Sequence, residues 1–443
     1  MSYFHLNFIL KGKLTVCCLL MLSVMPLNAQ REAKQIGDFK ESISLNEHLR
    51  GTKRTLQYRP DGDEFVCVNG KNRYTRALYG SHSPFRVETS DRPVFAFYNN
   101  GRGGNISFKV ILRDGTELAL DCTGHCESRY SAGKRTYYLT DPSWGKGELR
   151  ISVLALADMD GAIWRFSPSN MPKGAILRWQ HGGATGKRLS RNGDMGVDPA
   201  DCFELPVEAT DLVTGELSLQ KEVYLVRGEV PEGYNVRKLY QQAEAASLAL
   251  ASHLKIETPD PYLNTLGGAL VAAADGIWDG QVWLHGAIGW RMPLSGWRAG
   301  YTGDALGWHD RARTHFDAYA ASQVTDVPNT IPHPAQDSTM NLARSEKRWG
   351  TPQYSNGYIC RNPERNNQMH HYDMNLCYMD ELLWHFNWTG DTAYVRKMWP
   401  VITRHLAWEK LNYDPDNDGL YDAYACIWAS DALYYNSGAV THS

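Results

Sequence analysis

The feature that most constrains this chain is a change of periodicity near residue 230. Before it, from about 56 to 227, short segments rich in β-branched and aromatic residues alternate with turn pairs such as Asn69-Gly70. After it, the sequence is rich in Ala, Leu, Gln and Glu at helical spacing. The pattern predicts a multidomain β plus α protein, with an N-terminal β-sandwich at residues 30–229 followed by helices.

The helical half has its own order. A linker helix is expected within residues 230–259, and the remaining chain from 260 to 443 is expected to be an array of helices with long polar and aromatic loops. The periodic segments that we interpret as helices are 236–254, 263–278, 304–322, 369–388 and 392–411.

The first 29 residues have the pattern of a signal peptide. Lys11 and Lys13 are basic, residues 14–25 are apolar, and Ala29 ends a small-residue cleavage site. We therefore expect export and a mature chain that begins at Gln30. No later stretch approaches the roughly 20 apolar residues of a membrane span, so we expect a soluble protein. The residues before Cys17 and Cys18 lack the small-residue pattern of a lipoprotein processing site, so we expect soluble secretion rather than a lipid anchor.

The charge balance excludes one class of partner. Lys and Arg total 46 and Asp and Glu total 49, which leaves a formal charge of -3 and no basic field for nucleic acid. The chain has 14 Trp and 24 Tyr, whose rings can stack on sugar faces or fill hydrophobic cores. Composition leaves both uses of the aromatic residues open.

Cysteine usage leaves several readings open. Two of the nine cysteines, Cys17 and Cys18, fall within the leader, and the remaining odd number cannot pair completely within one chain. Cys122 and Cys126 could form a disulfide or bind a metal together with His125. We expect free or structural cysteines, because no further zinc ligands stand at suitable spacing.

A glycine- and tryptophan-rich loop leads to Asp304 at the expected start of a helix. A carboxylate at a helix N-terminus is stabilised by the helix dipole and can accept two hydrogen bonds from sugar hydroxyls. We predict a sugar subsite here; the alternative is a plain helix cap with the tryptophans in the core. The other residues predicted to line this subsite are Trp297, Arg298, Tyr301, Trp308, His309 and Asp310.

A second polar group opens the helix at 369–388. His370 and His371 point to different helix faces, and Asp373 is not four residues from either, so the spacing does not make a zinc site. We predict that His370, His371 and Asp373 lie at the rim of a sugar pocket, with a polar helix cap as the alternative. Asp380 and Glu381, further along, are expected to be structural.

The order of motifs near the end of the chain resembles the glycogen-debranching and glucosidase-type glycoside hydrolases. A helix hairpin leads to an aspartate-rich turn at 414–420 and then to the segment Trp428-Ala429-Ser430-Asp431, which is one residue longer than the family pattern. The resemblance implies an (α/α)6 barrel, inverting hydrolysis of an oligosaccharide or polysaccharide, Asp431 as the general acid and Trp428 at the subsite.

The resemblance also implies that part of the barrel is missing. Four barrel helices can be placed between 260 and 443, whereas six helix hairpins make a complete (α/α)6 toroid. We therefore expect an incomplete toroid whose catalytic base would come from a later helix.

The aspartate-rich turn also has a metal-binding interpretation. Asp414, Asp416 and Asp418 occupy the first, third and fifth positions of an EF-hand loop, but position twelve is Ala425 and not the bidentate glutamate. We expect a turn held by its own hydrogen bonds and no cofactor, with calcium as the alternative.

Together these features predict a secreted glycoside hydrolase. The helical half is also similar to an uncharacterised domain family of gut Bacteroidetes, which implies the periplasm of a Gram-negative cell. Two alternatives remain open: a non-catalytic glycan-binding protein, which would keep the aromatic residues, and a polysaccharide lyase, in which the toroid usually comes first.

Overall fold

The computed structural model describes residues 57–442 apart from 72–73, 100–101, 189–211, 287–290, 297–298, 326–329, 332–352, 355, 364–373, 415–416 and 424–438. Contacts between residues divide the chain into the units Met1–Gln57 and Tyr58–Ser443. All the elements described below belong to the second unit.

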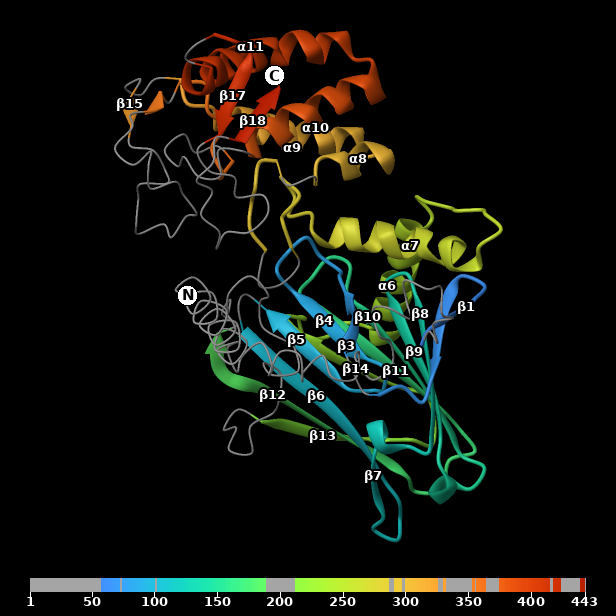
Figure 1. Ribbon diagram of the computed structural model, residues 1–443. Coiled ribbons are helices and arrows are strands. Elements are labelled where there is room, and N and C mark those ends of the chain that lie inside the picture. The colour runs from blue at the N-terminus through green and yellow to red at the C-terminus, as the bar shows by residue number, and fades with distance from the viewer. Residues whose placement is uncertain are drawn as a thin grey trace, which may run out of the picture. The chain divides into compact units, whose positions relative to one another are not determined.

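The N-terminal part of this unit contains two antiparallel sheets, as the turn pairs predict (Figure 1). The first has the order β1-β2-β8-β9-β10-β11-β14, and the second has the order β13-β12-β6-β5-β4-β3, with β7 paired to β6. The strands of the first sheet are β1 Arg59–Asp61, β2 Glu64–Val68, β8 His125–Ser131, β9 Lys134–Thr140, β10 Glu148–Ala155, β11 Gly161–Ser169 and β14 Val223–Gly228. Those of the second are β3 Tyr74–Leu78, β4 Arg86–Ser90, β5 Phe95–Asn99, β6 Arg102–Ile111, β7 Glu117–Ala119, β12 Ile176–Arg188 and β13 Val213–Ser218.

Aromatic side chains from both sheets form one hydrophobic core. Phe95 of β5 meets Trp164 of β11 edge to face, with 5.5 Å between ring centroids, and Phe108 of β6 meets Phe166 in the same way at 5.1 Å. All four side chains are at most 2% exposed. Edge-to-face pairs of this kind add about 0.5–1.5 kcal/mol beyond their buried area. The core therefore fixes the two sheets face to face.

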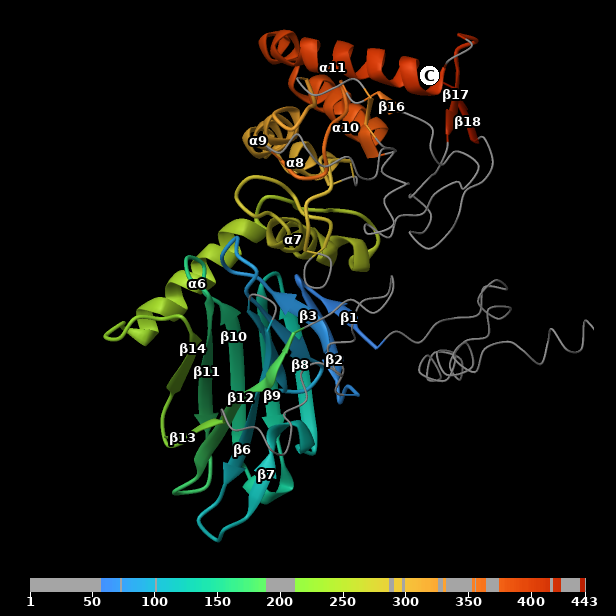
Figure 2. The same ribbon diagram turned by 90° about the vertical axis from the view of Figure 1, so that its left-hand side faces the viewer.

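The linker helix α6, Val236–Ala251, lies against the first sheet along β10, β11 and β14 (Figure 2). It begins where Asn235 accepts a hydrogen bond from the backbone N–H of Lys238 at 3.0 Å, and it ends three residues before the predicted boundary. Its buried side chains, Leu239 and Tyr240 among them, pack on Leu154 of β10. Hydrophobic burial therefore attaches α6 to the sheet.

The next helix, α7 Pro261–Gly276, begins and ends two residues before the predicted segment 263–278. Asp260 accepts a hydrogen bond from Tyr262 N at 2.8 Å, and proline occupies the first turn, where its missing N–H costs nothing. Thr265 Oγ1 donates to the carbonyl of Gly62 in the β1–β2 turn at 3.0 Å. The contact ties α7 to the first sheet.

The prediction of one helix at 304–322 was wrong. The structure has a short helix α8, Tyr301–Ala305, and a separate helix α9, His309–Ala320. Gly307 lies between them with φ of +74°, a conformation that interrupts a right-handed helix and that glycine adopts without strain. The break separates Asp304 from the helix that was expected to follow it.

The last two helices are α10, Met374–Thr389, and α11, Thr392–Tyr413. They are joined at Gly390, and Asp391 caps α11 by accepting hydrogen bonds from the N–H groups of Ala393 and Tyr394, each at 3.0 Å. Short strand pairs accompany them, β15 Thr330–Ile331 with β16 Gln353–Tyr354, and β17 Leu420–Ala423 with β18 Ala439–His442. Within the described ranges, no helix combines the length and the apolar character that crossing a membrane requires.

Candidate functional site

The short helix α8 faces α10 through a row of polar contacts. The hydroxyl of Tyr301, the first residue of α8, donates a hydrogen bond to Asp380 of α10. Gly300 lies so close to the carboxylate of Glu381 that a Cβ atom would not fit there. A side chain at residue 300 would therefore push the Glu381 carboxylate away from the start of α8.

Asp304 lies one helical turn further along and is only 3% exposed. Nδ1 of His309 is 2.7 Å from Asp304 Oδ1, and Nδ1 of His385 on α10 is 2.9 Å from both carboxylate oxygens. An ionised carboxylate only accepts hydrogen bonds, so each histidine must carry its proton on Nδ1. His385 is fully buried, and its Nε2 has no hydrogen-bond partner within the described residues. Asp304 is thus held between two imidazole rings.

The position of Asp304 bears on both interpretations of this residue. It is the fourth residue of α8, and Gly300 is the N-cap, so the interpretation of Asp304 as a plain helix cap was wrong. Its carboxylate already accepts hydrogen bonds from two histidines, which leaves it little exposed surface for a sugar hydroxyl. His309 lies on the solvent side of the cluster formed by Asp304, His309 and His385, because its side chain is 41% exposed.

The other residues that were predicted to contact sugar do not form one group. Trp308 is 8% exposed, and the guanidinium carbon of Arg311 lies 4.4 Å from the centroid of its ring, so it packs in the core beside a cation. Asp310 has a fully exposed carboxylate 3.7 Å from Arg313. The predicted residues that lie outside the described residues are Trp297, Arg298, His370, His371, Asp373, Trp428 and Asp431.

Helix α10 presents an exposed aromatic row beside Tyr301. Asp380, Trp384 and Trp388 follow one another at intervals of four residues and therefore share one helix face. Trp384 is 51% exposed and Trp388 is 56% exposed, although large aromatic side chains are usually well buried. We refer to Tyr301, Asp380, Trp384 and Trp388 together as the α10 face.

The electrostatics of the α10 face keep Tyr301 neutral. Burial raises the pKa of its phenol, and the hydrogen bond to Asp380 together with the negative charges of Asp380 and Glu381 raises the pKa further. The phenol therefore remains a hydrogen-bond donor at neutral pH. Asp380 is exposed and offers carboxylate oxygens to solvent. The face combines flat apolar rings with one donor and one charged acceptor.

Sequence reasoning missed most of this face. It treated Asp380 and Glu381 as structural, and it did not single out Trp384, Trp388 or His385 as site residues. The four-residue spacing from Asp380 to Trp388 was a usable signal. By contrast, the partner of His385 is 81 residues away, and no local pattern indicates that pairing.

The aspartate-rich turn is held by its own hydrogen bonds in the part that the structure describes. Asp414 Oδ1 accepts from Gly419 N at 3.3 Å, and Asp418 Oδ1 accepts from Leu420 N at 2.8 Å. Strand β17 follows, whereas an EF-hand would continue into a helix. Asp416 lies outside the described residues. Across the described ranges, no group of three or more His, Cys, Asp or Glu side chains is arranged to hold a metal ion.

The two cysteines that could have formed a disulfide are not bridged. Cys122 is exposed, while Cys126 is buried in β8 and its thiol points to the carbonyl of Asp91 at 3.8 Å. Burial, the largest effect, raises the pKa of the Cys126 thiol to about 12, which keeps it protonated. Of the readings that the sequence left open, the structure favours free cysteines.

Comparisons with known proteins give two matches of different kinds. Residues 100–230 match the model of a family described as "Domain of unknown function (DUF4450)", a match that lies within the two-sheet part of the chain. No curated protein matches the chain in sequence. Among solved structures, the chain is similar to a bacterial glucoamylase complexed with acarbose, with 8% identity and a TM-score of 0.41. This similarity covers 72% of the chain and 60% of the glucoamylase, so the chain spans less than two thirds of that enzyme's length.

Proposed function

We propose that this protein acts on carbohydrate and binds an oligosaccharide along the α10 face. The observation that carries the proposal is the pair of half-exposed tryptophans, Trp384 and Trp388, one turn apart and in line with Asp380. Sugar rings have an apolar face that stacks on indole and hydroxyl groups around the edge that need hydrogen-bond partners. The α10 face supplies the rings from tryptophan and the partners from Asp380 and Tyr301.

The length of the face suits more than one sugar. Residues four apart on a helix are about 6 Å apart along its axis, since the rise is about 1.5 Å per residue. Asp380, Trp384 and Trp388 therefore extend over about 12 Å, the scale of two to three sugar units. The ligand is accordingly an oligosaccharide or the end of a polysaccharide rather than a free monosaccharide.

We further propose that the complete activity is glycoside hydrolysis by an exported enzyme. Support comes from the order of the chain, in which two antiparallel sheets precede a linker helix and paired helices, and from the motif that contains Asp431. Asp431 would protonate the leaving oxygen, and a base would activate water about 6.5–9.5 Å away, as inverting enzymes require. The basic and apolar leader before Gln30 supports export to the periplasm.

One observation favours a second candidate, a glycan-binding protein without hydrolytic activity. The carboxylates described here already have partners, because Asp304 is bonded to two histidines and Asp380 to Tyr301. Groups held in this way fix the geometry of a binding surface more readily than they transfer protons. Cleavage and binding must therefore be measured separately.

The test uses a panel of fluorescently labelled oligosaccharides, assayed for cleavage and for affinity with the full chain. Trp384→Ala should weaken binding, whereas Trp399→Ala on α11 should not, although Trp399 is also 56% exposed. Binding that survives Trp384→Ala unchanged would place the carbohydrate site elsewhere. Cleavage products would identify a hydrolase and would exclude the second candidate.

A further inference from the structure

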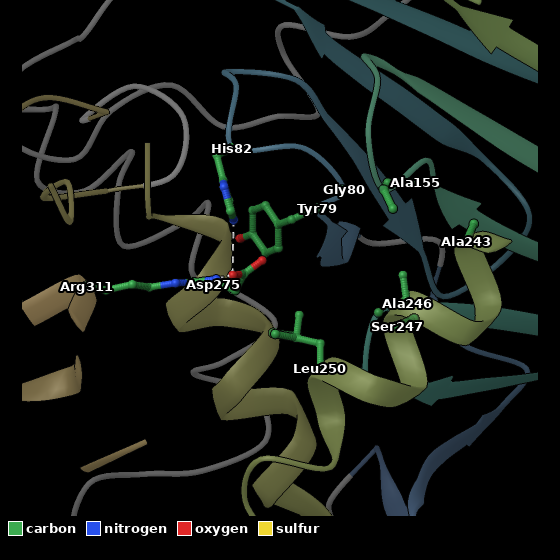
Figure 3. Close-up of a pocket in the computed structure, with 13 residues that line it drawn as sticks. Tyr79, Gly80, His82, Ala155, Ala243, Ala246, Ser247, Leu250, Asp275 and Arg311 are labelled. Atoms are coloured by element: carbon green, nitrogen blue, oxygen red, sulfur yellow. Dashed lines mark hydrogen bonds and ion pairs between the residues drawn. The ribbon is translucent and has the colours of Figure 1, made fainter. Parts of the chain in front are cut away.

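A pocket that shares no residue with the α10 face lies where the first sheet, α6, α7 and α9 meet (Figure 3). Its volume is about 210 Å³. One wall is polar and includes His82 from the loop after β3, Asp275 near the end of α7 and Arg311 of α9. Opposite it, Ala155, Ala243, Ala246 and Leu250 form an apolar wall.

The polar wall is built around one carboxylate. Asp275 Oδ1 accepts a hydrogen bond from Arg311 Nη1 at 2.7 Å, and it lies 3.2 Å from His82 Nε2. Oδ2 accepts no hydrogen bond from the described residues, so it remains an acceptor for a ligand. Burial alone would raise the pKa of Asp275, but the hydrogen bonds and charges of His82 and Arg311 outweigh it and lower the pKa. The carboxylate is therefore ionised at neutral pH.

Two close approaches shape the cavity. The ring of Tyr79 lies flat on Gly276 of α7, where a Cβ atom would collide with the ring. Gly133, in the β8–β9 turn with φ of +77°, leaves room for the hydroxyl of Ser247, which donates to the carbonyl of Ala132 at 2.7 Å. Glycine at both positions lets helices and sheet come together while the cavity stays open.

Tyr79 adds a neutral group to the pocket. Burial, and then the nearby carboxylate of Glu88, raise the pKa of the phenol to about 12. The hydroxyl is therefore protonated in neutral solution and can donate or accept one hydrogen bond. The ring itself offers an apolar surface beside the charged groups.

We propose that this pocket binds a neutral molecule with two adjacent hydroxyl groups, the size of one sugar ring or a cyclic polyol. Asp275 and Arg311 compensate each other's charge. An anionic ligand would be repelled by the carboxylate, and a cationic ligand would be repelled by the guanidinium. One hydroxyl donates to Asp275 Oδ2, and its neighbour accepts from His82 or Arg311. The alanine wall receives the apolar face of the ring.

The size of the cavity agrees with this ligand class. The volume of about 210 Å³ is far above the roughly 10–15 Å³ that holds a single water molecule, so the pocket has room for a small molecule. That space accommodates one six-membered ring with its hydroxyl groups, and any further units of an oligosaccharide would lie outside the pocket. The pocket shares no residue with the α10 face, so this inference does not depend on the proposed function.

The test is isothermal titration of the full chain with D-glucose, D-galactose and myo-inositol, and with inorganic phosphate as an anionic probe. At least one of the neutral polyols should bind to the wild-type chain. Asp275→Asn should weaken that binding about ten- to a hundredfold, because it removes a charge-assisted hydrogen bond. Ala246→Phe, at an exposed residue that lines the pocket, should weaken it by narrowing the mouth of the cavity, whereas Ala245→Phe, at the preceding residue of α6, which is also exposed but does not line the pocket, should leave it unchanged.

Each result of these titrations either supports or contradicts the proposal. The proposal is wrong if none of the three polyols binds, if phosphate binds in their place, or if Ala246→Phe binds as the wild type does. Far-ultraviolet circular dichroism checks that each variant is folded, and Trp384→Ala should leave polyol binding intact. Affinity for a methyl glycoside and an oligosaccharide as well as the free sugar identifies a chain terminus as the ligand. Affinity for the free sugar alone identifies a monosaccharide.

Discussion

Glu88, on β4 beside the pocket, should make the stability of the two-sheet part depend on pH near neutrality. Burial raises the pKa of its carboxyl to about 7, from an ordinary value of 4.5, and the positive charge of Arg86 only partly opposes the shift. Between these two pH values the native chain holds a proton that the unfolded chain releases. Because the folded pKa is the higher one, the stabilisation is complete below pH 4.5 and is lost as the pH rises through 7.

The magnitude follows from the shift. Each pKa unit corresponds to about 1.36 kcal/mol, so the free energy of unfolding should fall by about 3 kcal/mol between pH 4.5 and pH 7.5 on account of this one group. Glu88→Gln keeps the shape and removes the titration. The difference in unfolding free energy between wild type and Glu88→Gln should therefore change by this amount over the range.

The assay is urea unfolding of both proteins at several pH values, followed by circular dichroism. Glu148→Gln, at an exposed position of β10, is the matched control for removing a surface carboxyl. A difference between wild type and Glu88→Gln that stays constant from pH 4.5 to pH 7.5 would refute the reasoning. It would mean that Glu88 is charged within the fold.

Three further predictions concern the helical half. Burial lowers the pKa of His315 to about 3, so the free energy of unfolding of the wild type should fall by up to about 1.4 kcal/mol per pH unit as the pH drops below 6.5. In His315→Gln this contribution should be absent, which urea unfolding of both proteins measures. Gly303→Ala forces a methyl group against the ring of Trp283 and should lower the free energy of unfolding by about 1–3 kcal/mol, seen as a lower Tm. Asp304→Asn replaces the Oδ2 acceptor that faces Nδ1 of His385 by an N–H donor and should cost about 1–3 kcal/mol of stability. An unchanged Tm in either of the last two variants contradicts the packing described.

The sequence predicted the order of β and α segments because that information is local. Turn pairs such as Asn69-Gly70 mark where strands end, and Asn69 does have positive φ, at 50°. The caps of α7 and α11 are equally local. The break at Gly307 was missed because an isolated glycine inside a helical pattern is compatible with either outcome.

The candidate sites were predicted only in part, since they depend on contacts between distant segments. Tyr301 and Asp304 could be singled out from the loop that precedes them. Their partners on α10 are 79 and 81 residues away, and His82 is 193 residues from Asp275. Local spacing carries no information on such pairs, which form only when the helices pack.

Hydrogen–deuterium exchange of the full chain with and without a binding oligosaccharide tests the central claim most directly. If the α10 face holds the sugar, exchange should slow in peptides covering 374–389 and 301–305, because ligand contact stabilises α10 against local opening. Peptides from the two sheets, residues 58–228, should keep their rates. Protection confined to 58–228, with no change in α10, would contradict the account.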